Sequence, residues 1–231
     1  MIGKTNSISK SGADIGAMIN VTTTESTLNG KNCLLKLNNV TVATAVFSNG
    51  GCSFPRITIY GNYVVEASDG TNTATTTVTV TAQNILDKDS LNATIQFTYP
   101  LPTANVGDTL TIAGLDCMCI GTNRYVYMSN IGGGSTWDNA VSSAQNWAVP
   151  TNLTNMYNVS NKALMTLNEA NALSSAQRTT LVNAVGNDMW LGTSYSSTTA
   201  YFISINEGQI KNDGDKSSGN RVAPAFTIAM K

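Results

Sequence analysis

From Ala17 to Ala82 the sequence is a series of short runs rich in Val, Ile and Thr, each bounded by Gly, Asn, Asp or Ser. Branched side chains fit the pleated surface of a strand, and the bounding residues favour turns. The runs are residues 18–24, 32–37, 41–48, 52–59, 63–68 and 73–82. Strands this short bury an apolar face only against a second sheet, so the pattern predicts a small β-sandwich.

The clearest hairpin joins the last two runs through Asp69 and Gly70. An Asp-Gly pair adopts left-handed backbone conformations easily, and a tight turn requires them. The inward face predicted from this turn comprises Tyr63, Val65, Ala67, Ala74, Val78, Val80 and Ala82. The segment 68–81, SDGTNTATTTVTVT, resembles the immunoglobulin-like domains that are common in phage structural proteins and bacterial surface proteins. The resemblance implies an all-β immunoglobulin-like sandwich.

The composition changes after the last of these runs. Residues 83–105 combine an Asp/Lys/Ser turn, one alternating run at Ala93, Ile95 and Phe97, and two prolines, which is typical of a linker. Residues 1–15 are small and polar without periodicity, and we predict an arm that is ordered only where something, such as a partner subunit, holds it. The predicted divisions are the arm (1–15), the sandwich (16–83), a linker with a leading strand (84–105) and a second domain (106–231).

The second domain mixes strands with helices. One helical stripe comprises Trp137, Ala140, Val141, Ala144 and Trp147. It predicts an amphipathic helix capped by Ser135 or Thr136 and ended before Pro150. We expect Trp137, Trp147 and also Trp190 to be core residues. Strands are predicted in 108–114, 115–121, 124–130, 189–194, 200–206, 208–212 and 222–230.

Two further helix starts carry a capping-box spacing. Thr166 precedes Glu169 by three positions, and Ser174 precedes Gln177 by the same interval. Gly186 is expected to stop the second of these helices, because glycine tolerates the left-handed conformation of a helix end.

The order of elements after Val106 is strands, helix, irregular segment, helices and closing strands, which resembles the C-type-lectin-like fold. Residues 106–130 and 157–173 are similar to the opening and the central strand of a family of uncharacterised domains related to formylglycine-generating sulfatase modifiers. At the end of the chain the similar residues are Trp190, Leu191, Ala200, Tyr201, Gly208, Arg221, Val222, Pro224, Ala225 and Phe226. Met189 departs from the family pattern by replacing its first Trp, and Ala223 departs from it as an insertion. The resemblance implies an α+β C-type-lectin-like domain, a fold that hosts many activities, so function must be argued from a site.

Catalysis is disfavoured by the residue types present. The chain contains no histidine, which excludes Ser-His-Asp triads, imidazole bases and nearly all catalytic zinc sites. Sulfatase modifiers use reactive cysteines, but Cys117 and Cys119 lie two apart in an apolar strand, so both are expected in the core as inert thiols. For Cys33 and Cys52 a disulfide is left open, with free thiols favoured. We predict no catalytic residue, no metal and no cofactor.

The composition of the chain argues against two classes of partner, nucleic acids and membranes. The net charge is −1 and only 12% of residues are charged, so the chain lacks the basic surface that nucleic acid would need. Residues 1–21 contain no visible secretory signal, and no apolar run approaches the length of a membrane span, so membrane insertion is not expected.

Two loops supply the candidate ligand-binding residues. Tyr195 lies in the polar loop GTSYSSTTAY, where an aromatic side chain is available for recognition, although an exposed tyrosine without a partner is an equal alternative. Asn212, Asp213, Asp215 and Asn220 lie in KNDGDKSSGN. The first three of these carry oxygens of the kind that calcium binds, but an ordinary solvated turn is favoured.

These features favour display or binding over chemistry. The expected protein is a non-enzymatic bacteriophage virion subunit, such as a head fibre, capsid decoration or tail appendage, assembled in the host bacterial cytoplasm. Its expected partners are other virion proteins, further copies of itself in an oligomer such as a trimer, and a host-surface glycan or protein. The alternative is a bacterial cell-surface adhesin with the same two modules, which an upstream leader in the gene would favour.

Overall fold

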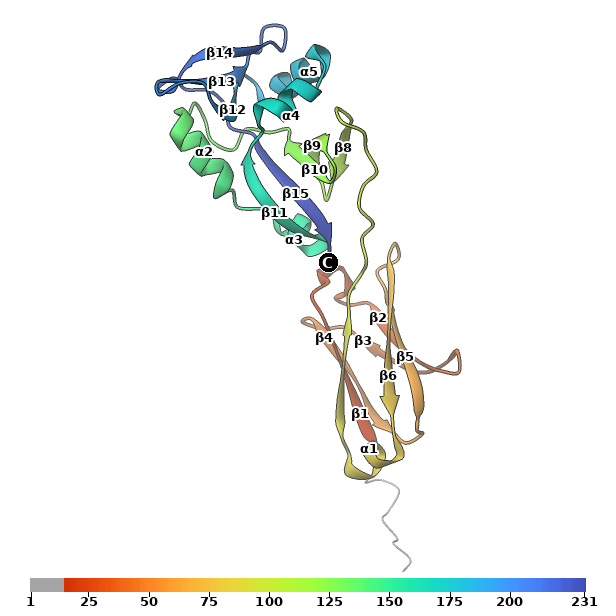
Figure 1. Cartoon of the computed structure of the whole chain (residues 1–231). Helices are drawn as coiled ribbons and strands as arrows, with labels where there is room; N and C mark the ends of the chain where they lie inside the picture. Colours follow the sequence, from red (N-terminus) through yellow and green to blue (C-terminus); the bar gives the residue numbers. More distant parts are fainter. Residues whose placement is uncertain (1–14) are drawn as a thin grey trace, which may run out of the picture. The chain divides into compact units, whose positions relative to one another are not determined.

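The computed structural model describes residues 15–231, in two compact units that are mostly β-sheet (Figure 1). Unit 1 ends at Thr98 and unit 2 begins at Tyr99. The predicted arm falls almost entirely on residues 1–14, which lie outside the described residues.

From residue 15 onward, unit 1 contains two sheets, and all six predicted runs form strands in it. Its elements are β1 (Ala17–Thr23), a 3-10 turn (Ser26–Leu28), β2 (Asn32–Leu37), β3 (Val40–Val46), β4 (Gly51–Ile57), β5 (Gly61–Ser68), β6 (Thr73–Val80), α1 (Ala82–Asp87) and β7 (Ser90–Ile95). One sheet has the strand order β4-β1-β7 and the other β3-β2-β5-β6. Alternate residues along β1 and β5, such as Ile19, Val21, Tyr63 and Val65, are buried, as expected for strands with one face on a core.

The hairpin of β5 and β6 places Tyr63 opposite Val78 and Ala67 opposite Ala74, and the inward face predicted for these strands is buried from Tyr63 to Ala67 and from Ala74 to Val80. Its turn differs in detail from the prediction. Gly70 has a left-handed φ of 102°, whereas Asp69 acts through its side chain. The Oδ1 atom of Asp69 accepts hydrogen bonds from the backbone N–H groups of Thr71 (2.9 Å) and Asn72 (2.7 Å).

The predicted boundary near Asn84 needs correction, because residues 84–98 belong to unit 1. Thr81 and Asn84 form a capping box that starts α1, so Ala82 is an exposed helical residue and not part of an inward strand face. The strand β7 then pairs in parallel with β1 and buries Ala93 and Ile95. The turn-like residues after β6 therefore form α1, which leads the chain from β6 in one sheet to β7 in the other.

The structure does contain a connecting segment without helix or strand, but this segment begins at Tyr99, later than predicted. Two tyrosine hydroxyls of unit 2 donate hydrogen bonds to the backbone of the two prolines in this segment. Tyr157 donates to the carbonyl oxygen of Pro100 (3.0 Å), and Tyr125 donates to that of Pro102 (3.3 Å).

Unit 2 contains a five-stranded sheet of order β11-β15-β10-β9-β8, a three-stranded sheet of order β12-β13-β14, and four helices. Its elements are β8 (Thr109–Ile112), β9 (Leu115–Gly121), β10 (Arg124–Tyr127), α2 (Trp137–Gln145), α3 (Thr151–Met156), β11 (Tyr157–Leu164), α4 (Leu167–Ala172), α5 (Ser175–Val185), β12 (Met189–Ser194), β13 (Thr199–Ile203), β14 (Ile210–Asp215) and β15 (Pro224–Met230). All pairs in the larger sheet are antiparallel.

Both faces of the larger sheet are covered. Met118 and Ile120 of β9 pack on one side with residues of α4, α5 and β12, and Cys117 and Cys119 pack on the other with Phe226 and Trp147. The prediction that both cysteines point to the core from one strand face is confirmed. A third cluster lies between α2 and the smaller sheet and contains Trp190 and Phe202.

The helix predicted from the tryptophan stripe is α2, and two of the three tryptophan placements are confirmed. Trp190 and Trp147 are buried, whereas Trp137 at the start of α2 is only partly buried. Neither Ser135 nor Thr136 caps α2 through its side chain. The backbone N–H of Trp137 instead donates to the carbonyl oxygen of Lys216 (2.9 Å).

Both capping boxes of the sequence analysis are confirmed. Thr166 and Glu169 bond reciprocally at the start of α4, and Ser174 and Gln177 do so at the start of α5. Gly186 ends α5 with φ 91°, in the predicted left-handed conformation.

Candidate functional site

The connection between β12 and β13 carries the most exposed aromatic residue of unit 2, Tyr195. We call residues 194–199 the Tyr195 loop. The Tyr195 side chain is 57% exposed. Its ring meets the ring of Tyr201 edge to face, with centroids 5.5 Å apart and an interplanar angle of 86°. This contact supports the Tyr195 ring from one side, while more than half of the residue stays exposed to solvent.

The Tyr195 loop is held by hydrogen bonds centred on Ser196. The Ser196 hydroxyl oxygen accepts from the backbone N–H groups of Thr198 (3.2 Å) and Thr199 (3.0 Å). The carbonyl oxygen of Thr199 accepts from the backbone N–H groups of Tyr195 (3.1 Å) and Ser196 (3.0 Å). These bonds close the loop on itself, so the backbone that carries Tyr195 has a defined conformation.

Lys216 joins the Tyr195 loop to helix α2. Its Nζ donates to the carbonyl oxygens of Ser196 (2.8 Å) and Ser197 (3.4 Å) and lies 4.6 Å from the centroid of the Trp137 ring. Trp137 in turn donates through Nε1 to the carbonyl oxygen of Leu191 (2.8 Å). Because the ammonium group lies over the ring of Trp137, that face is not free to stack on a ligand.

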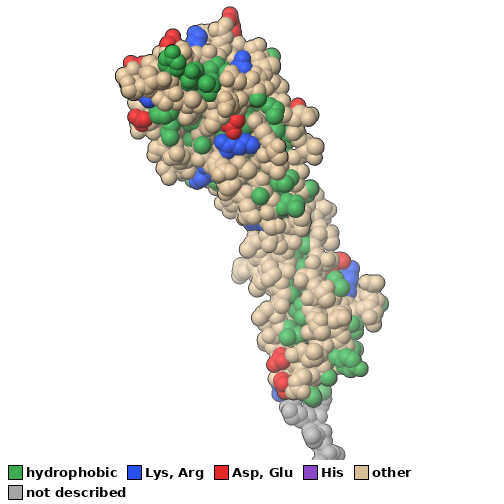
Figure 2. All heavy atoms as spheres, in the orientation of Figure 1, with side chains coloured by type: hydrophobic (Ala, Val, Ile, Leu, Met, Phe, Trp, Pro, Cys, Tyr) green, Lys and Arg blue, Asp and Glu red, His purple; other side chains and the backbone are tan. Residues whose placement is uncertain are grey.

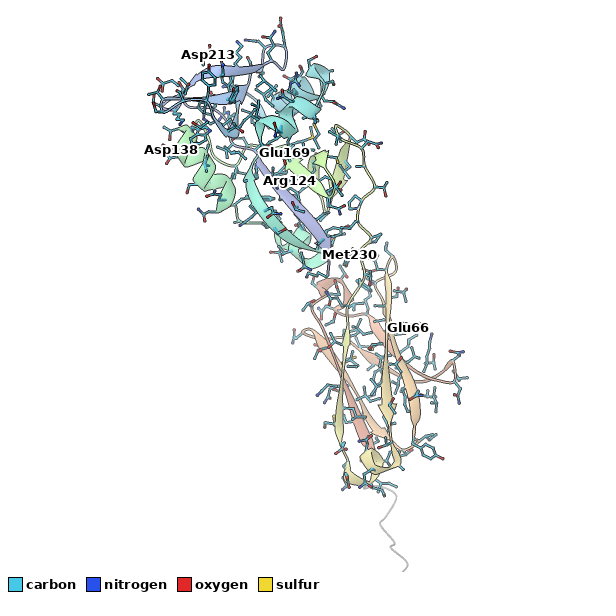
Figure 3. The ribbon with its side chains drawn as sticks, viewed as in Figure 1. Glu66, Arg124, Asp138, Glu169, Asp213 and Met230 are labelled. Carbon is cyan, nitrogen blue, oxygen red and sulfur yellow. The ribbon has the colours of Figure 1, made fainter. Side chains whose placement is uncertain are left out.

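The other predicted ligand-binding residues are spread over two places. Asn212 and Asp213 are exposed on β14, which extends through Asp215, so they belong to a strand and not to a loop (Figure 3). Asp215 pairs with Thr199 in the strand ladder and therefore lies beside the Tyr195 loop. Asn220 lies elsewhere, where its backbone forms a bridge with Ser135.

Asp215 has a structural role in its turn. Its Oδ1 accepts from the backbone N–H and from the hydroxyl of Ser217, both at 2.8 Å. These hydrogen bonds lower the pKa of Asp215, because they stabilise its charged form. In residues 15–231, no group of three or more His, Cys, Asp or Glu side chains is placed to hold a metal ion.

Sequence reasoning identified Tyr195 but missed Ser196 and Lys216. The run of serines and threonines around Tyr195 was the signal for a loop that bonds its own backbone. No local signal exists for Lys216, because its bonds cross 20 positions to Ser196.

Two groups of ionisable side chains outside this loop are candidate sites. Arg124 donates through Nε to Glu169 at 2.8 Å, and Figure 3 shows the two residues lying together. A depression lined by Thr109, Asp116 and Cys117 holds a carboxylate and a thiol. Burial raises the pKa of Cys117 to about 12, so this thiol stays protonated and is a poor nucleophile at neutral pH.

The surface is dominated by uncharged polar groups. Figure 2 shows Lys, Arg, Asp and Glu side chains scattered singly or in pairs over the visible face, without a large area of one sign. Such a surface gives no long-range field to steer a charged ligand, so recognition would depend on short-range contacts.

In comparisons with known proteins, neither a family model nor a curated protein matches this chain. The resemblances described for residues 68–81 and 106–231 therefore stay predictions. Among residues 15–231, no helix has both the length and the apolar character needed to cross a bilayer.

Proposed function

We propose that this chain is a non-enzymatic structural protein of a bacteriophage virion, used as a head fibre, capsid decoration or tail appendage. Unit 1 is proposed as an immunoglobulin-like module and unit 2 as a C-type-lectin-like module that contacts a host-surface glycan or protein. The observation that carries the proposal is the Tyr195 loop, which presents a largely exposed aromatic ring on a backbone fixed by its own hydrogen bonds.

A loop of this kind suits recognition because little conformational freedom is lost on binding. Tyrosine has a large flat face and few rotatable bonds, and the contact with Tyr201 already restricts its ring. The Ser194 hydroxyl donates to the carbonyl oxygen of Ser196 (2.8 Å) and so adds to the hydrogen bonds that fix the loop. Weak contacts of this type become effective when many copies act together.

Strand β3 supports assembly into a larger particle. It is an edge strand, and Val40, Val42 and Val46 on it are 63%, 50% and 56% exposed. Its sequence, VTVATAV, has neither the charged residue nor the proline that protects most edge strands from pairing. An edge of this composition favours contact with another subunit of a virion.

The binding role is tested with Tyr195→Ala in the full chain. Binding to host cells and to arrays of bacterial polysaccharides should fall about tenfold or more, since an exposed aromatic anchor carries much of the energy of a small interface. Tyr60→Ala is the matched control, because Tyr60 is 70% exposed on unit 1 and should leave binding unchanged. Equal binding by the wild type and Tyr195→Ala would remove the recognition role and leave an architectural one.

Particle location is a separate test. Antibodies raised against the full chain should label purified virions. The chain itself should co-purify with capsid or tail proteins. Label on the surface of uninfected bacteria instead would favour the adhesin alternative and contradict the virion assignment.

A further inference from the structure

Two cysteines face each other from the two sheets of unit 1. Cys33 lies on β2 and is fully buried, on the same strand face as the buried Leu35. Cys52 lies on β4 opposite Val21 of β1, two positions before the buried Phe54. Because side chains alternate along a strand, Cys52 shares the inward face of its sheet with Phe54.

The backbone around both cysteines is tied to one short connection, the turn between β3 and β4. The N–H of Phe47 donates to the carbonyl oxygen of Lys31 (3.0 Å), two positions before Cys33. The N–H of Ser48 donates to the carbonyl oxygen of Gly51 (2.8 Å), one position before Cys52. Because Phe47 and Ser48 are adjacent, these two bonds bring the first residues of β2 and the first residues of β4 to the same end of unit 1.

The two thiol groups lie close enough to shift each other's titration. Cys52 raises the pKa of Cys33, with burial adding to the effect. Cys33 in turn lowers the pKa of Cys52, because its interaction with Cys52 favours the thiolate of the latter. Cys52 is also the more exposed of the two, so it is the thiol that a reagent meets first.

We propose that Cys33 and Cys52 form a disulfide between the two sheets when the folded protein meets a low-molecular-weight disulfide as oxidant. The Cys52 thiolate attacks one sulfur of the reagent, forms a mixed disulfide and releases one reagent thiolate. That thiolate takes the proton of the Cys33 thiol. Cys33 then attacks the Cys52 sulfur and releases the second reagent thiolate.

In this exchange two protein thiols are oxidised by two electrons and the reagent disulfide is reduced to two thiols. The new bond closes a loop of about 20 residues, which restricts the unfolded chain more than the folded one. Unit 1 would therefore be more stable after it leaves a reducing compartment. This redox site is independent of the binding role of unit 2.

The test uses the full native chain incubated with oxidised glutathione and then alkylated. Trypsin cleaves after Lys31, Lys36 and Arg56, so Cys33 and Cys52 fall on the separate peptides 32–36 and 37–56. We expect one species containing both peptides, which separates on reduction, while Cys117 and Cys119 in the same digest are recovered as free, alkylated thiols. Recovery of peptides 32–36 and 37–56 apart, each alkylated or glutathionylated, would overturn the proposal.

Stability gives a second measurement. Oxidation should raise the melting temperature of unit 1 by about 10 °C, and reduction should reverse the rise. Cys52→Ala, at the less buried position, should abolish the rise and leave the reduced protein folded. A rise of the same size in oxidised Cys52→Ala would contradict the proposed pairing, as would an unchanged melting temperature in a cross-linked wild type.

Discussion

Single residues set limits on how closely the elements of unit 2 pack. Gly214 on β14 is pressed against two rings, because a Cβ atom at this position would lie 2.7 Å from Cζ3 of Trp190 and 2.8 Å from Cδ1 of Phe202. Asp and Gly disfavour strands, so a prediction from local propensity ends this strand at residue 212, whereas β14 continues to Asp215. The strand continues because the missing side chain lets β14 lie against the core.

Gly214→Ala should therefore destabilise unit 2 by about 1–3 kcal/mol, since buried rings have to move to admit one methyl group. Gly133→Ala is the control, because a Cβ atom at Gly133 meets nothing within 4 Å. Urea unfolding of the two variants and the wild type measures the difference. Equal midpoints for all three would show that β14 does not depend on this close approach.

Asp69 is the residue in unit 1 with the clearest pH dependence. Hydrogen bonds from the backbone N–H groups of Asn72 and Thr71 lower its pKa from the usual 3.8 to about 2. A carboxyl group with a lowered pKa stabilises the folded state above its unfolded pKa, and the contribution is lost as the pH falls.

We expect the stability that Asp69 contributes to be present above about pH 4 and to disappear between about pH 4 and pH 2. Asp69→Asn keeps an oxygen acceptor for the turn but removes the titrating charge, so its melting temperature should fall less over this interval. Asp87→Asn, at an exposed carboxylate that accepts a hydrogen bond from Gln83, is the control for the removal of one negative charge from unit 1. Parallel profiles for wild type and Asp69→Asn would contradict the assignment.

Elements differ in how much of them the sequence predicts. The strands of unit 1 and the capping boxes of α4 and α5 follow from patterns within a few residues, and both were predicted. The pairing of β7 with β1 was missed, because it joins residues about 70 positions apart and the intervening α1 looks like a linker turn. For the same reason Tyr195 could be selected from its loop, whereas the bonds from Lys216 that hold this loop could not.

The capping box of α5 is testable by itself. Ser174→Ala removes the hydroxyl that accepts from the backbone N–H of Gln177 (3.2 Å) and should cost about 1 kcal/mol of unfolding free energy. Ser174→Asp keeps an acceptor at the helix start and should recover most of the loss. Chemical denaturation measures both, and equal losses in the two variants would show that the cap is not the cause.

At the scale of the whole molecule, every strand pairing in residues 15–231 joins two strands of the same unit. Each unit also has its own buried core. Autonomous cores are the condition for separate folding, so the two units should fold without each other.

Fragments 1–98 and 99–231 should each show a cooperative urea transition. Fragment 1–84 is the matched control. It ends at the boundary predicted from the sequence and lacks β7, so one edge of β1 stays unpaired, the core loses Ala93 and Ile95, and the transition should be lost or broadened. A cooperative transition in fragment 1–84 would restore the earlier boundary.

The position of β15 has a consequence for synthesis. This strand is the last element of unit 2 along the chain, yet it lies second in its sheet, between β11 and β10. The ribosome must therefore release residues 224–230 from its exit tunnel before the two halves of that sheet can join. The described strands of unit 1 end at Ile95, so that unit can fold while unit 2 is still being translated, whereas the larger sheet of unit 2 stays open to chaperones until β15 has left the exit tunnel.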